Sequence, residues 1–214
     1  MFSQLNSDMS LSSTHTMTCP VCGKIGDADL YSSVNVHENP ELKEKVSSGE
    51  LFVWTCPECG HKSVLRYPVL YHDPDEKVMV WLTFDEEAQQ QAKRFFNSME
   101  SLNEYCGRLV DDTGSLIEKV HIFDAGLDDL AIEMCKYVIR QEKGSELSLK
   151  FVRMDGAEGD LIFTYPKDGQ MEMLAVGLNV YEDCRGILSR NPDVASSAKG
   201  LVRIDEGWIS SVIR

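Results

Sequence analysis

The sequence contains no run of basic residues. Its formal net charge at pH 7 is −14, from 21 Lys and Arg against 35 Asp and Glu, and its pI is about 4.7. Phosphate binding requires clustered Lys and Arg side chains. The balance therefore disfavours a nucleic-acid-binding surface, although Lys62 and Arg66 offer a small local patch. We expect instead a protein partner with a basic surface, or a small molecule.

Long apolar runs are also lacking. No stretch approaches the roughly 20 residues that span a bilayer, and the N-terminal segment has neither the cationic start nor the apolar run of a secretory signal peptide. The seven cysteines are an odd number, and Cys106, Cys135 and Cys184 fall within apolar helical patterns as buried small side chains. The number and placement of the cysteines indicate one metal cluster in a reducing compartment, and not a disulfide framework. We therefore predict a cytoplasmic protein without membrane association.

One six-residue motif, Thr-Cys-Pro-x-Cys-Gly, begins at Thr18 and occurs again from Thr55. Zinc prefers four soft ligands in a tetrahedron, and two cysteines separated by two residues bind one ion from a single tight turn. The glycine after the second cysteine permits the positive φ that such a turn needs. Two turns supply four ligands and close the site, which predicts one structural Zn²⁺ per chain. The predicted ligands are Cys19, Cys22, Cys56 and Cys59.

The motif pair has other interpretations. A thioredoxin-like redox pair has one Cys-x-x-Cys that opens a helix after a strand, whereas here there are two and no helical pattern follows either. Iron also fits four thiolates, and the spacing does not distinguish it from zinc. His61, directly after the second motif, could replace a cysteine or bond a thiolate, but a strand side chain at the edge of the site is commoner.

No catalytic residue is predicted. His72 stands beside Asp73 and suggests acid–base chemistry, but adjacent strand residues point to opposite faces, so we expect a histidine bonded to backbone beside a turn. Asp129 and Glu133 lie one helical turn apart and could bind a divalent cation. Paired carboxylates at this spacing are common on exposed helices, so we interpret them, with Lys136, as a solvated face.

The pattern of apolar residues predicts an α+β protein. Residues 1–13 are polar and small, as in a disordered leader. Residues 14–84 are rich in strand patterns, including one strand over 62–72, and form the predicted zinc-ribbon-like β unit. Residues 85–144 form a helical segment, whose first helix places apolar side chains at spacings of three and four as far as Cys106. Residues 145–214 are predicted to form an antiparallel sheet with helices.

The stretches "TCPVCG" and "PELKEKVSSGELFVWTCPECGHKSVLRYPVLYHDPDEKVMVWL" resemble the CpXC domain, a bacterial and archaeal family named for its two CPxC motifs. The resemblance covers roughly residues 14–140. It implies a zinc-ribbon-like N-terminal unit whose metal ligands are Cys19, Cys22, Cys56 and Cys59, and it implies no reaction.

The sequence therefore predicts a zinc-binding protein in which a structural Cys₄ site supports a protein-interaction module. Two alternatives stay open: an enzyme with its active site between the two halves, and a thiol-based sensor of zinc or of redox state. The broad apolar face of the helix over 86–106 needs a partner surface, which leaves a homodimer open.

Overall fold

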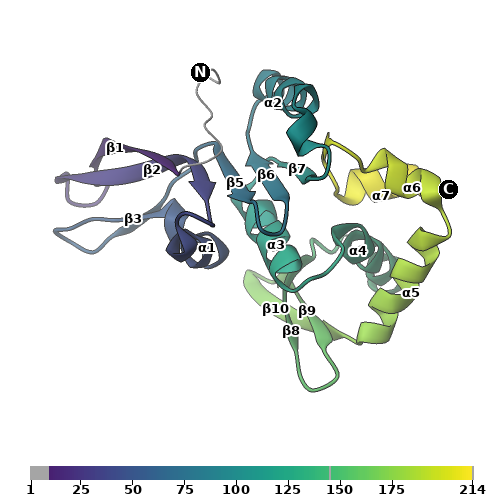
Figure 1. Ribbon diagram of the computed structural model, residues 1–214. Coiled ribbons are helices and arrows are strands. Elements are labelled where there is room, and N and C mark those ends of the chain that lie inside the picture. The colour runs from purple at the N-terminus through teal and green to yellow at the C-terminus, as the bar shows by residue number, and fades with distance from the viewer. Residues whose placement is uncertain (1–9, 145, 214) are drawn as a thin grey trace. The chain divides into compact units, whose positions relative to one another are not determined.

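The computed structural model describes residues 10–144 and 146–213, and it is a mixed α+β protein as predicted (Figure 1). The chain divides into two compact units, Met1–Ile117 and Glu118–Arg214. The division falls within helix α3 (Thr113–Asp124). The boundaries that the sequence predicts at 84/85 and 144/145 are a different division and stay predictions.

The first unit contains a mixed sheet and a separate hairpin. Its strands are β1 (Leu11–Thr18), β2 (Ile25–Asn35), β3 (Val53–Thr55), β4 (Lys62–Val64), β5 (Val69–Asp73), β6 (Val78–Leu82) and β7 (Cys106–Val110). The sheet has the order β1-β2-β5-β6-β7, with parallel pairing of β2 to β5 and of β6 to β7. The neighbouring pairs β1–β2 and β5–β6 are antiparallel, and β3 pairs with β4 alone.

Helices α1 (Pro40–Ser47) and α2 (Glu86–Ser98) belong to the same unit, with 3₁₀ turns at Glu50–Phe52 and Glu100–Leu102. Proline at the first position of α1 is favoured because its missing N–H would have no partner there. The Asp85 carboxylate accepts a hydrogen bond from the Ala88 N–H at 2.7 Å and caps α2. Strands β5 and β6 are buried along their whole length and form the centre of the sheet.

Two local predictions in this unit are wrong. The predicted strand over 62–72 is two strands, β4 and β5, because Pro68 interrupts the pattern and cannot donate a ladder hydrogen bond. The predicted helix to Cys106 ends at Ser98, and Cys106 begins strand β7 instead. Of the predicted leader, residues 1–9 lie outside the described residues, whereas β1 begins at Leu11 and pairs with β2.

The second unit holds the predicted antiparallel meander. Its strands are β8 (Lys150–Asp155), β9 (Asp160–Lys167), β10 (Gln170–Val176) and the short β11 (Leu201–Val202). Its helices are the end of α3, α4 (Asp129–Lys143), α5 (Leu178–Ser189), α6 (Pro192–Ser197) and α7 (Glu206–Val212). A two-residue loop joins β9 to β10, and Asp168 and Gly169 both have positive φ, as the tightest hairpin turns require.

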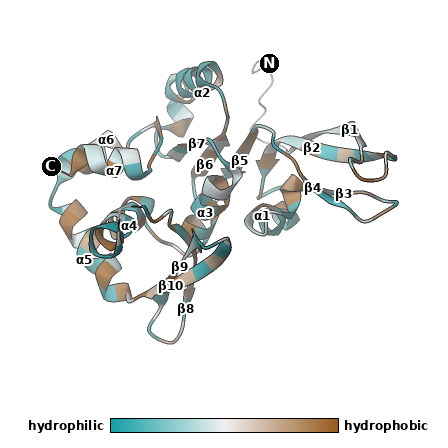
Figure 2. Ribbon diagram, turned by 180° about the vertical axis from the view of Figure 1, so that it is seen from behind, coloured by the Kyte–Doolittle hydropathy of each residue, from teal (hydrophilic) through white to brown (hydrophobic). Residues whose placement is uncertain are grey.

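One hydrophobic core joins the elements of the second unit. Phe151 and Phe163, from paired strands β8 and β9, are fully buried and pack edge to face. Helix α5 buries Tyr181, Cys184 and Leu188 at spacings of three and four, and Figure 2 shows hydrophobic and hydrophilic residues alternating along it. Amphipathic helices on one side of a sheet thus account for this part of the fold.

Candidate metal centre

The two Cys-Pro-x-Cys-Gly motifs form two turns with the same backbone hydrogen bonds. We call the turns at residues 19–23 and 56–60 the two knuckles. In the first, the Gly23 N–H donates to the Cys19 carbonyl at 3.0 Å; in the second, the Gly60 N–H donates to the Cys56 carbonyl at 3.0 Å. Both glycines have φ near +70°, at 70° and 71°, so the turn explains why glycine stands at this position.

The knuckles lie between β1 and β2 and between β3 and β4, and they bring all four cysteines together. The four Sγ atoms lie within 4.8 Å of one another. The Cys19–Cys59 and Cys22–Cys56 Sγ–Sγ distances, which join one knuckle to the other, are both 3.6 Å. A tetrahedral zinc ion with Zn–S bonds of about 2.3 Å separates its sulfur ligands by about 3.8 Å. The geometry therefore fits one metal ion, and four cysteines close together could hold it.

Backbone N–H groups favour a thiolate at this site. The N–H groups of Cys22 and Val21 are directed at the Cys19 sulfur and lower the pKa of that thiol to about 6. The pKa of Cys22 is raised to about 12: the Lys24 N–H favours its thiolate, but partial desolvation of the sulfur and the neighbouring thiols oppose a second negative charge. A bound dication offsets that repulsion, which is why metal binding at such sites releases protons.

A small hydrophobic core supports the knuckles. Cys19 and Cys56 are buried with Ala28 and Trp54, whereas Cys22 and Cys59 are exposed. The Trp54 indole N–H donates to the Asp27 carbonyl at 3.1 Å and so joins β3 to β2. Trp54 belongs to no recognisable motif, but a lone tryptophan directly before the second motif is a local indication of such a core.

Two histidines that the sequence singled out have other placements. The His61 carbonyl accepts the Cys56 N–H at 2.8 Å, so its backbone closes the second knuckle. The His72 side chain is buried in β5, with its Nε2 3.3 Å from the Tyr105 hydroxyl. Asp73 bonds elsewhere: it accepts the Glu76 N–H at 3.1 Å and lies 3.5 Å from the Lys43 ammonium.

The predicted solvated face on α4 is wrong. Asp129, Glu133 and Lys136 are each less than 5% exposed, because α3 supplies buried charges that pair with them. Lys119 bonds Asp129 at 2.6 Å, and Lys136 bonds Glu118 at 3.0 Å. The two carboxylates that suggested a cation site thus face lysines. Glu118 and Lys119 were not predicted to take part, although a charged pair within the apolar run of α3 is a usable indication of buried ion pairing.

Three cysteines lie outside the knuckles. Cys135 on α4 and Cys184 on α5 are buried on apolar helix faces, as predicted. A hydrogen bond between their thiols and burial raise the pKa of Cys135. Cys106 was predicted on a helix and lies instead in β7, partly exposed.

Among residues 10–144 and 146–213, no helix is long and apolar enough to cross a membrane.

Comparison with known proteins yields one match. No curated protein and no solved structure matches the chain. The family described as CpXC protein matches residues 17–136, more than half of the 214 residues. Because this match includes both knuckles and all four clustered cysteines, the chain belongs to the CpXC family.

Proposed function

We propose that the protein binds one zinc ion per chain through Cys19, Cys22, Cys56 and Cys59, and that this ion is structural. The observation that carries the proposal is the pair of 3.6 Å Sγ–Sγ distances that link the two knuckles. Four protein thiolates complete a tetrahedron and leave no open position for water or substrate. The zinc then holds the β1–β2 and β3–β4 hairpins against each other.

The zinc-supported hairpins serve as a protein-interaction module in this proposal. Val21, Ile25 and Val64 lie in or beside the hairpins and are 67%, 67% and 80% exposed. Single exposed apolar residues are common on protein surfaces, but three large ones near a rigid metal site suit contact with another protein. The net charge of −14 favours a partner with a basic surface.

Elemental mass spectrometry of protein purified without added metal tests the site. We expect about one zinc per chain, together with four additional reactive thiols after chelation. Iron in place of zinc would correct the identity of the metal, and the four-cysteine site itself would stand. Absence of metal, with two or more thiols already oxidised, would overturn the proposal and favour a redox function.

The interaction module has a separate test. Proteins retained from a lysate by the wild type are compared with those retained by a Val21→Ser/Val64→Ser variant and by a Met171→Ser variant, which changes an exposed side chain on β10. We expect a specific set of proteins to be lost only with the first variant, with zinc content unchanged. Equal retention by all three would remove the hairpins as the contact surface.

A thiol-based sensor is the second candidate function, and the exposure of Cys22 and Cys59 favours it. Thiolates are the oxidisable form of cysteine, so an exposed pair can lose its metal as it oxidises. Titration with hydrogen peroxide distinguishes the two functions. Zinc release at peroxide concentrations that leave the other cysteines reduced supports sensing, whereas retention of zinc supports the structural function.

A further inference from the structure

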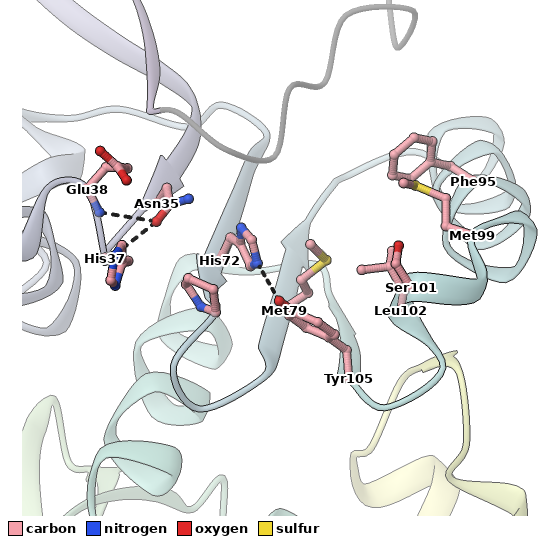
Figure 3. A pocket seen from close by; sticks show the side chains of 11 residues that line it. Asn35, His37, Glu38, His72, Met79, Phe95, Met99, Ser101, Leu102 and Tyr105 are labelled. Carbon is pink, nitrogen blue, oxygen red and sulfur yellow. Dashed lines mark hydrogen bonds between the residues drawn. The ribbon is translucent and has the colours of Figure 1, made fainter.

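A pocket of about 420 Å³ lies in the first unit, and none of the four clustered cysteines lines it. The end of β2, strands β5 and β6, helix α2 and the segment before β7 supply its walls (Figure 3). Pockets of about 300–1,000 Å³ are typical of small-molecule sites. Neither the family match nor the proposed zinc site assigns a ligand to this pocket.

One side of the pocket is apolar. Phe95 and Met99 come from α2 and its end, and Leu102 comes from the following 3₁₀ turn. Met79 from β6 lies between them and the polar side, as Figure 3 shows, and it is fully buried. Methionine side chains adapt to the shape of a ligand and contact aromatic rings favourably through sulfur. This side suits a flat aromatic ring.

The opposite side is polar and rigid. The Asn35 side chain is buried and accepts the backbone N–H groups of His37 and Glu38 at 3.0 Å and 3.3 Å, which fixes its orientation. Between the two sides, His72 Nε2 lies 3.3 Å from the Tyr105 hydroxyl. A ligand that spans the pocket therefore meets apolar atoms at one end and hydrogen-bonding groups at the other.

The charge of the polar side favours a cationic group. His37 and Glu38 lie at the exposed rim, and no Lys or Arg is among the described residues that line the pocket. His37 donates a hydrogen bond from Nδ1 to the Asp75 carboxylate at 3.0 Å, and this bond and the negative charge of Asp75 raise the pKa of His37. A protonated His37 is neutralised by Asp75, so Glu38 supplies the remaining charge among the lining residues, and a negative charge disfavours anions.

We propose that this pocket binds a small molecule with an aromatic ring and an amine. The ring lies against Phe95 and Met99, close to the buried Met79, and the amine lies at the rim near Glu38. The proposal is independent of metal binding by the knuckles.

Methionine-methyl NMR of the full chain with zinc tests the proposal, with tryptamine as the probe. We expect the Met79 and Met99 methyl resonances to shift on titration, with binding in the millimolar range or tighter for a molecule of this size. The exposed Met171 and Met173 on β10 serve as an internal reference and should not shift. Absence of shifts at Met79 and Met99, or equal shifts at all four, would overturn the proposal.

Two related compounds and three variants separate the contribution of the aromatic ring to binding from that of the amine's charge. Tryptophol, neutral with the same ring, should bind more weakly than tryptamine, and the anionic indole-3-acetate most weakly. Glu38→Gln should weaken tryptamine roughly two- to fivefold, as expected for an exposed ion pair, and leave tryptophol unchanged. Ser101→Trp should abolish both sets of shifts, whereas Ser98→Trp, on α2 outside the lining, should retain them. Thermal unfolding of each variant shows that it is folded. Equal affinity for tryptamine and indole-3-acetate would exclude the amine assignment.

Discussion

At the scale of single residues, Cys56 offers the sharpest test of the metal centre. It is buried in the small core beneath the knuckles and contacts Cys22. Metal binding and folding are one equilibrium in closed thiolate sites, so Cys56→Ser should lose the zinc and destabilise the hairpins by several kcal/mol. Thermal unfolding and metal content measure this. Cys106→Ser, in β7 and outside the cluster, is the control and should retain one zinc. Unchanged unfolding of Cys56→Ser would refute the structural function.

Glu118 is the second residue whose replacement is informative. It accepts hydrogen bonds from Lys136 and from the Phe151 backbone N–H, at 3.0 Å and 2.8 Å. Removing one partner of a buried ion pair leaves an uncompensated charge, so Glu118→Gln should lower the free energy of unfolding by about 3–5 kcal/mol. Chemical denaturation measures the loss. Glu182→Gln removes an exposed pair with Arg185 and should cost less than about 1 kcal/mol.

The same buried network predicts how stability depends on pH. Burial opposes the charge of Glu118, but Lys136, Lys150 and Lys119 hold its pKa below the usual value. A carboxylate with a lowered pKa stabilises the fold above its unfolded pKa, near 4.3 for Glu, and this stability is lost as pH falls through the lowered folded value. The free energy of unfolding of the wild type should therefore fall more steeply below about pH 4 than that of Glu118→Gln. Parallel profiles would contradict this account.

The clustering of the four cysteines could be predicted from the sequence, whereas the buried ion pairs between α3 and α4 could not, for a physical reason. Each knuckle is a local turn, so the spacing of Cys19 and Cys22 already determines that both can face one ion. The charges of α4 are paired with Glu118 and Lys119, which lie on α3, and the sequence of α4 alone does not contain that information. A charged helix face is exposed to solvent only when no neighbouring element covers it.

At the scale of elements, the contact between the two hairpins depends on Gly26 in β2. A Cβ at this position would lie 3.0 Å from the Pro57 ring and 3.1 Å from the Trp54 indole. Neither ring can move easily, so Gly26→Ala should destabilise the hairpins by about 1–3 kcal/mol. The control is Gly186→Ala in α5, where nothing lies within 4 Å of the added carbon; it should stabilise by about 0.5–1 kcal/mol. Thermal unfolding distinguishes the two, and equal shifts would contradict the proposed contact.

The elements that the sequence predicts well carry their own boundary residues. Asp85 caps the start of α2, and the Asp168–Gly169 turn separates β9 from β10. Strand β7 was missed because it pairs with β6, whose partner residues lie 28 positions earlier in the chain, and its sequence "CGRLV" follows directly on a helical pattern. Strand propensity depends on such neighbours more than helix propensity does, and this explains why the helix was extended too far.

At the scale of the whole molecule, the division into two units predicts an uneven response to chelation. The hairpins that carry the knuckles have only a small core around Trp54, whereas the second unit has a large continuous core that includes Phe151 and Phe163. Stability that metal supplies should therefore be lost locally. After chelation, we expect amide hydrogen exchange to quicken strongly in β1 to β4 and to stay slow in β8 and β9.

Hydrogen exchange measured by mass spectrometry, with and without chelator, resolves these segments separately. Protein treated with chelator and then resupplied with zinc is the control, and it should regain slow exchange in the hairpins. Uniform quickening across both units would mean that the metal stabilises the chain as one cooperative structure. Unchanged exchange in the hairpins would mean that Trp54 and the backbone bonds of the knuckles hold them without metal, so the site would serve binding or sensing of the ion instead of folding.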